Sequence, residues 1–173
     1  AASTAAVTVD LRMTTAQVST GDASGDVLTA IENLTGSAFG DVLTGDAGDN
    51  MLAGGDGDDL LAGLDGADTI DGGAGVDVVS YAGSQAGVTV NLTTNVNTGG
   101  DAEGDLLSNI EQVTGSSFND VLTGDAGANT LLGDDGDDVL AGMAGADVID
   151  GGAGNNTADY SASGAAVYVN INA

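Results

Sequence analysis

The stretch from Gly45 to Ser80 reads GDAGDNMLA, GGDGDDLLA, GLDGADTID and GGAGVDVVS when it is cut every nine residues. Positions 1 and 4 of each nonapeptide are Gly, position 6 is Asp or Asn, and position 8 is Leu, Ile or Val. The first six residues predict a turn, because Gly reaches backbone angles that are closed to other residues. The last three predict a short strand whose central aliphatic side chain points inward. One nonapeptide cannot bury that side chain alone, so we expect the repeats to stack.

Stacking places the position-6 side chains in rows along the turns. Such a row of carboxylates repels itself unless cations lie between its members. Carboxylates and backbone carbonyls are hard oxygen ligands, which calcium prefers. The pattern therefore predicts calcium sites between stacked turns.

The repeats resemble the pattern GGxGxDxUx of the RTX proteins, and GGDGDDLLA from Gly54 to Ala62 fits it at every specified position. The resemblance implies an all-β fold, a right-handed parallel β-roll (a β-helix or solenoid) with two nonapeptides per turn. It also implies that calcium lies between successive turns on one edge. Position-6 side chains of both turns would hold the ion, with carbonyls at positions 2 and 4 of one turn and 1 and 3 of the next.

A longer period overlies the nonapeptides, because GSAFGDVLTGDAG at 36–48 recurs as GSSFNDVLTGDAG at 115–127, an offset of 79 residues (115 − 36). We divide the chain into a first repeat unit at 1–81, a second at 82–160, and the opening strand of a third at 161–173. An alternating strand begins each unit, and a polar spacer follows it. The roll is expected either to be continuous or to form two calcium blocks joined by a wider strand segment.

Two nonapeptides per turn assign the position-6 residues to four rows. The expected rows are Asp41, Asp59, Asp77; Glu32, Asn50, Asp68; Asp120, Asp138, Asn156; and Glu111, Asn129, Asp147. The resemblance assigns carbonyl ligands to the turn residues Gly54, Gly55, Asp56, Gly57, Gly63, Asp65, Gly66, Gly72, Gly73, Gly75, Gly133, Asp135, Gly136, Gly142, Gly145, Gly151, Gly152 and Gly154. Two gaps per row predict about eight calcium ions, or about six if the Glu positions do not take part. Sites that include Asn should be weaker, since Asn offers an oxygen but no charge.

Six residues carry expectations of their own. Phe39 and Phe118 occupy position 4 in the first nonapeptide of each unit, where the later nonapeptides have Gly, and we expect them to cap the core. Leu64 and Met143 occupy position 2, where a side chain is tolerated only outside the left-handed region. Tyr81 and Tyr160 are expected to pack at the block ends.

Composition limits the functions that the chain can have. It carries 27 acidic residues against a single basic one, Arg12, for a formal charge of −26. Nucleic acids and anionic membranes bind through Lys and Arg, so neither is an expected partner. No apolar run is long enough to span a bilayer, and no signal peptide is visible at the start. The Ser and Thr residues have no His, Lys or Cys to activate them, so we assign no catalytic residue and expect no enzyme.

The repeats thus predict a calcium-binding structural module. The resemblance to RTX proteins implies that it belongs to a secreted or cell-surface protein, of the kind that leaves bacteria by type I secretion. Without calcium, an acidic disordered chain is expected. Two alternatives stay open. One is end-to-end self-assembly of the roll into filaments, a surface layer or an adhesin, and the other is an accessory roll of a larger extracellular enzyme.

Overall fold

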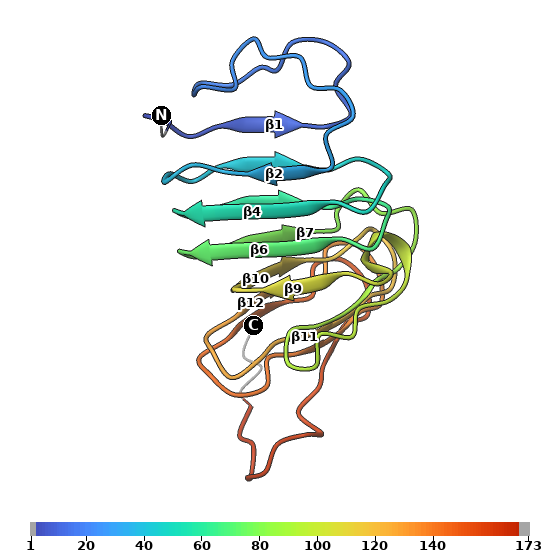
Figure 1. Ribbon diagram of the computed structural model, residues 1–173. Coiled ribbons are helices and arrows are strands. Elements are labelled where there is room, and N and C mark those ends of the chain that lie inside the picture. The colour runs from blue at the N-terminus through green and yellow to red at the C-terminus, as the bar shows by residue number, and fades with distance from the viewer. Residues whose placement is uncertain (1–2, 170–173) are drawn as a thin grey trace.

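The computed structural model describes residues 3–169, which stack as short rungs along one axis (Figure 1). The only helical turn among them is the 3-10 turn Gly100–Ala102. The strands are β1 (Thr8–Asp10), β2 (Asn33–Thr35), β3 (Val42–Thr44), β4 (Met51–Asp56), β5 (Leu60–Ala62), β6 (Thr69–Ala74), β7 (Val78–Ser80), β8 (Thr89–Asn91), β9 (Leu106–Ser108), β10 (Gln112–Thr114), β11 (Val121–Thr123), β12 (Thr130–Leu132), β13 (Val139–Ala141), β14 (Val148–Asp150) and β15 (Thr157–Ala158). Among the described residues, no helix has the length and apolarity that a membrane crossing needs.

The strands form three sheets with parallel pairing, so the expected parallel β-roll is confirmed. One sheet has seven strands in the order β1-β3-β5-β7-β10-β12-β14. Two sheets of four strands, β2-β4-β6-β9 and β8-β11-β13-β15, form the other faces. Within a block, paired residues such as Leu43 and Leu61 are one turn, or two nonapeptides, apart.

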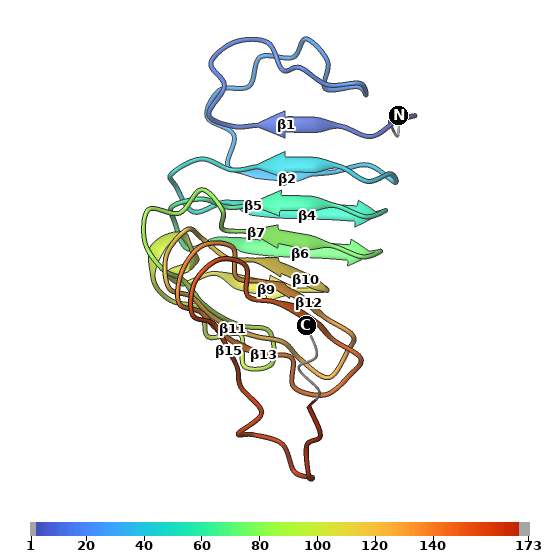
Figure 2. The same cartoon turned by 180° about the vertical axis from the view of Figure 1, so that it is seen from behind.

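The seven-stranded sheet runs through both sequence units, and Figure 2 shows β5, β7, β10 and β12 following one another from behind. Its continuity depends on β10, which pairs with β7 on one side and β12 on the other. In the first unit, the strand that corresponds to β10 is β2, and it lies in a four-stranded sheet. The roll is therefore continuous, but the two units use opposite faces for equivalent strands.

Aliphatic side chains from the seven-stranded sheet and from both four-stranded sheets form one core. The position-8 residues point inward and are at most 1% exposed: Leu43, Leu52, Leu61, Ile70, Val79, Leu122, Leu131 and Leu140. Their strand neighbours are more exposed, as the alternation of a strand requires. Each fully buried Leu or Val contributes about 1.5–3 kcal/mol, so stacking supplies the free energy that one repeat lacks.

Two expectations about individual residues were wrong. Phe39 and Phe118 are 44% and 45% exposed, because position 4 lies in the turn and its side chain does not reach the core. Leu64 and Met143 adopt φ of 74° and 70°, the region that position-2 glycines such as Gly55 and Gly73 also use. In these turns Leu and Met therefore adopt the left-handed conformation that glycine takes elsewhere.

The ends of the units differ from each other. Tyr81 is buried, as expected, but Tyr160 is 42% exposed. Residues 161–169 form no strand. The remainder of the expected third opening strand, 170–173, lies outside the described residues.

Candidate metal centres

The position-6 carboxylates lie between the rungs of the roll. Five of these residues are at most 1% exposed although each has an ionisable carboxyl group: Asp41, Asp59, Asp68, Asp77 and Asp138. The side chain of each accepts a hydrogen bond from the backbone N–H of a residue one turn earlier. The Asp41 N–H, for example, donates to Asp59 Oδ1 at 2.7 Å, and the Asp59 N–H donates to Asp77 Oδ1 at 2.9 Å.

Eight such contacts between position-6 residues, or their equivalents, connect successive turns at 2.7–3.0 Å. They join Asp41–Asp59–Asp77–Glu111 and Asn129–Asp147 along the seven-stranded sheet, Asn50–Asp68–Asp105 along β2-β4-β6-β9, and Asp120–Asp138–Asn156 along β8-β11-β13-β15. Each pair brackets one gap between two turns.

The second carboxylate oxygen of four of these residues has no partner. Oδ2 of Asp59, Asp68, Asp77 and Asp138 is buried and accepts no hydrogen bond in the described structure. A buried polar atom without a partner costs about 1–3 kcal/mol, and a charged one costs more. These four atoms therefore mark the places where a positive group fits.

A glycine at position 1 shapes the space beside each free oxygen. A Cβ on Gly54 would collide with Asp59 Oδ2 and lie 2.6 Å from the Gly72 carbonyl oxygen. A Cβ on Gly133 would likewise collide with Asp138 Oδ2 and lie 2.8 Å from the Gly151 carbonyl oxygen. The glycines thus leave a cradle whose walls are carboxylate and carbonyl oxygens.

Carbonyls at positions 2 and 4 stack in the same turns. The carbonyls of Gly55 and Gly57 lie directly against Gly73 and Gly75 of the next turn, where positive φ leaves room for them. In residues 3–169, no group of three or more acidic, His or Cys side chains converges on one point. A metal in a gap would thus take its ligands from a pair of side chains and from backbone carbonyls, an oxygen set that fits calcium.

Burial raises the pKa of several row residues. The pKa of Asp68 rises to about 7, because burial disfavours the charged form and the Asp105 and Asp49 carboxylates repel it. The pKa of Asp105 rises to about 6, again mainly through burial. Burial also raises the pKa of Asp59, Asp77 and Asp138. A cation is the natural partner for carboxylates that the fold holds away from water.

The two Glu positions behave differently. The Glu111 carboxylate accepts the Asp77 N–H at 2.9 Å. Glu111 therefore contacts the last turn of the first unit, in addition to its expected place in the row of Asn129. Glu32 is exposed, and its side chain makes no hydrogen bond with Asn50. The backbone of Glu32 nonetheless lies one turn before Asn50, because the Met51 N–H donates to the Glu32 carbonyl at 3.0 Å.

Asp105 is a row residue that the nonapeptide count missed. Its Oδ1 accepts the Asp68 N–H at 2.9 Å, and its Oδ2 accepts the Tyr81 hydroxyl at 2.8 Å. The signal was present in the sequence, because Asp105 precedes the buried Leu107 by two residues, as position 6 precedes position 8. The count missed it because Asp105 and Glu111 are six residues apart rather than nine.

The predicted carbonyl ligands all lie in the turns or at strand ends. The side chains of Asp56, Asp65 and Asp135 are exposed, so only their backbone oxygens can face a gap. Position 5, which the sequence did not single out, forms an outer ladder. There the Val76 N–H donates to Asp58 Oδ1 at 2.9 Å, and the Ala67 N–H donates to Asp49 Oδ1 at 2.9 Å.

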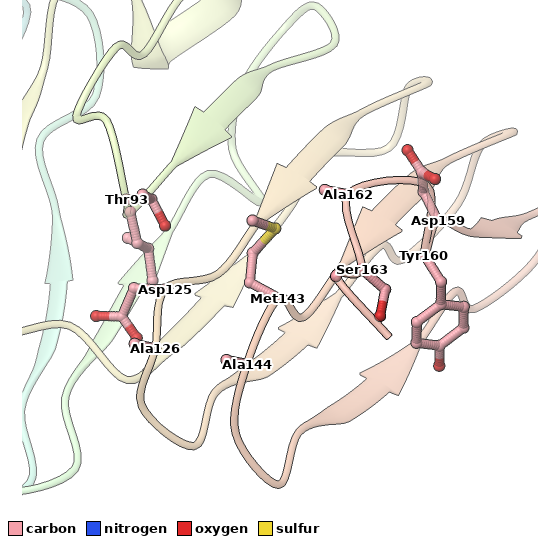
Figure 3. Close-up of a pocket in the computed structure, with 11 residues that line it drawn as sticks. Thr93, Asp125, Ala126, Met143, Ala144, Asp159, Tyr160, Ala162 and Ser163 are labelled. Atoms are coloured by element: carbon pink, nitrogen blue, oxygen red, sulfur yellow. The ribbon is translucent and has the colours of Figure 1, made fainter. Parts of the chain in front are cut away.

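A cavity of about 580 Å³ lies apart from the rows, beside the last rungs (Figure 3). Leu92, Met143 and Tyr160 supply its apolar walls, and Asp125 and Asp159 supply its carboxylates. No nucleophile with an activating base lines it, so it offers no catalytic constellation.

Comparison with known families agrees with this geometry. The model of the RTX calcium-binding nonapeptide repeat matches four times, over residues 29–61, 53–83, 108–140 and 132–161. Together these matches cover more than half of the chain. The chain belongs to this family. No curated protein matches the chain.

RTX repeats bind calcium, and the matched ranges contain all the position-6 residues of the eight contacts except Asp105. The repeat is a structural calcium-binding module rather than a catalytic one. RTX repeats are typical of secreted bacterial proteins.

Proposed function

We propose that this RTX roll folds when it binds calcium outside the cell, and that it serves as a stabilising structural module of a secreted or cell-surface protein. The observation that carries the proposal is the set of four buried carboxylate oxygens without partners, on Asp59, Asp68, Asp77 and Asp138. A chain that buries these charges needs a cation to neutralise them.

The proposed ligands are the paired row side chains together with the turn carbonyls. Eight contacts bracket eight gaps, so the proposal assigns about eight ions, two of them in the gaps Asp77–Glu111 and Asp68–Asp105. Gaps that contain Asn50, Asn129 or Asn156 bind more weakly because they hold one charge fewer. Eight divalent ions would offset about 16 of the 26 formal negative charges.

The mechanism is a concentration switch. Extracellular calcium modules bind at about 10⁻⁴ to 10⁻³ M, far above the free calcium inside a cell. The chain therefore stays unfolded inside, where mutual repulsion of its acids opposes compaction and a type I secretion channel can pass it. Outside, calcium fills the gaps, and the free energy of binding becomes free energy of folding.

A calcium titration followed by far-UV circular dichroism tests this proposal. We expect a coil spectrum in chelator, a cooperative gain of β signal with added calcium, and full reversal when chelator returns. Magnesium should fail to replace calcium, because it demands near-ideal octahedral geometry. A β spectrum that chelator leaves unchanged would overturn the proposal.

End-to-end self-association is a second candidate function. The outer edges of β1, β2, β14 and β15 have no strand partner among the described residues. Unpaired parallel edges are templates for further strands.

A further inference from the structure

The junction between the two units shows in detail how one unit receives the next. Strands β6 and β7 end the first unit, and β9 and β10 of the second unit pair with them in parallel register, Ile70 with Leu107 and Val79 with Val113. The Tyr81 hydroxyl donates to Asp105 Oδ2, and the N–H groups of Asp68 and Asp77 donate to Asp105 and Glu111. The junction therefore combines strand pairing, core burial and two of the candidate metal gaps.

The end of the roll that carries β14 and β15 has the same elements as the first unit's side of this junction, β6 and β7. Adding the 79-residue offset turns β6 and β7 into β14 and β15, and Tyr81 into Tyr160. Tyr160 is 42% exposed where Tyr81 is 1% exposed, because no strand within residues 3–169 covers it. The turn beyond it is the same in both places, since the Ser84 N–H donates to the Tyr81 carbonyl at 2.9 Å and the Ser163 N–H donates to the Tyr160 carbonyl at 3.0 Å.

The opposite end of the roll has the same elements as the second unit's side of the junction, which carries β9 and β10. Residues 26–34 correspond to residues 105–113, so that Asp26 matches Asp105 and Ile31 matches Ile110. Asp26 is exposed where Asp105 is buried, and Ile31 is 38% exposed where Ile110 is 5% exposed.

This opposite end is already in its docked conformation. Gly25 and its counterpart Gly104 have φ of 87° and 91°, and Ala30 and its counterpart Asn109 have φ of 54° and 52°. Ala30 keeps a left-handed backbone although no partner strand holds it there. Preorganisation of this kind lowers the cost of association.

We propose that the end of the roll that carries β14 and β15 binds the end that carries residues 26–34 of a second copy of this chain, in the register of the internal junction. In that complex β14 pairs with residues 27–29 and β15 pairs with β2. Tyr160 donates its hydroxyl to Asp26 of the second copy, and the Asn156 N–H donates to Glu32.

The charges of the two ends make this contact depend on calcium, and the proposal therefore rests on the proposed function. Asp147 and Asp26 would face each other as Asp68 faces Asp105, and Asn156 would face Glu32 as Asp77 faces Glu111. Without a cation, the two carboxylates of the Asp147–Asp26 gap repel each other, and the Glu32 carboxylate faces Asn156 with no charge to balance it. With calcium, the ends supply the partners that Glu32 and Tyr160 lack.

Disulfide trapping tests the register, because the chain contains no Cys. Val148 and Val27 correspond to the paired residues Thr69 and Leu106, and both are outward-facing, 58% and 59% exposed. Neighbouring strands hold paired residues within the Cα separation of about 4.4–6.8 Å that a disulfide requires. A chain with V148C is mixed with a chain with V27C under mild oxidation, with and without calcium. The matched control replaces V148C by V121C, which lies on an inner strand and is 40% exposed.

We expect about tenfold more mixed disulfide for V27C with V148C than for V27C with V121C, and only in calcium. Adding Ile31→Asp to the V27C chain should abolish the excess, since Ile31 would be buried at the contact. Circular dichroism of every variant in calcium reports folding separately. Folded chains that crosslink no more than the control would overturn the docking proposal alone. Chains that stay unfolded in calcium would overturn the proposed function and this inference with it.

Discussion

A carboxylate at position 6 has two separate tasks, one for each oxygen. Oδ1 of Asp59 accepts a backbone N–H from the turn before it, as an Asn oxygen also could. Oδ2 has no partner, and it is this oxygen that distinguishes Asp from Asn. Structural and metal-binding contributions can therefore be separated by a single substitution.

Asp59→Asn should weaken calcium binding in both gaps that flank it. The amide keeps the Oδ1 contact but places N–H donors where the free oxygen lies, so the ion loses a charged ligand. We expect the affinity of these gaps to fall about tenfold, or about 1.4 kcal/mol, in calorimetric titration. Asp58→Asn is the matched control, because Asp58 is exposed and outside the rows, and it should change the affinity less than twofold. Equal effects of the two variants would contradict the assignment.

Tyr81→Phe should destabilise the calcium-loaded roll. Among the described residues, the Tyr81 hydroxyl is the only donor to Asp105 Oδ2, and both side chains are 1% exposed. Loss of a buried hydrogen bond that leaves an acceptor unsatisfied costs about 1–3 kcal/mol, measurable by urea unfolding in saturating calcium. Tyr160→Phe in dilute solution should leave stability unchanged, because Tyr160 makes no side-chain hydrogen bond among the described residues.

At the scale of the strand, one inward side chain per rung holds the roll together. Leu61 is fully buried in the core, whereas Leu60 beside it is 40% exposed. Leu61→Ala should cost about 2–5 kcal/mol in urea unfolding with calcium present, and Leu60→Ala much less. Similar losses for both would mean that the alternation of the strand does not set the core.

The nine-residue phase predicted most of this architecture. Position 8 identifies the buried aliphatic side chains and position 6 identifies the buried acids. Because the turn has a fixed length, each position of the nonapeptide faces the same side of the roll in every repeat. The sequence could not predict how the units join. Val78 and Gln112 are paired although they are 34 residues apart, and Thr69 and Leu106 are paired although they are 37 apart. Neither spacing is the 18 residues of a regular turn, so the phase is lost across the polar spacer.

The loss of phase also explains why the nonapeptide count misses Asp105. Asp105 and Glu111 are six residues apart rather than nine, so counting back nine residues from Glu111 reaches Ala102 instead. A role for Glu32 in calcium binding stays a prediction. The exposed Phe39 shows a different limit, since a large apolar side chain at position 4 lies in a turn, outside the strand positions that form the core.

For the whole molecule, protons and calcium compete for the same buried acids. The folded-state pKa values of Asp68 and Asp105, about 7 and about 6, lie above the ordinary value of 3.8. The metal-free folded state therefore binds protons more tightly than the unfolded chain. Its stability from these groups is complete below about pH 3.8 and is lost as the pH rises through 6 and 7.

We accordingly expect acid to replace calcium in part. In chelator, the chain should be unfolded at pH 8 and should gain β signal as the pH falls through 7 and 6. With calcium present, the calcium concentration at the folding midpoint should fall over the same pH range, because protons already stabilise the folded state. The affinity of the folded sites for calcium should weaken at the same time, since protons must leave before the ion binds. Circular dichroism at a series of pH values measures both. A midpoint that rises on acidification, or a chain that gains no β signal in chelator at any pH, would contradict the account.

The central claim is that calcium lies between the turns, against the carboxylate oxygens that the fold leaves without partners. A crystal structure of the calcium-loaded chain, with an anomalous difference map that locates the ions, tests it most directly. The account predicts peaks about 2.3–2.6 Å from Oδ2 of Asp59, Asp68, Asp77 and Asp138, each completed by turn carbonyls. Gaps that hold only water beside these oxygens in a folded roll would contradict it.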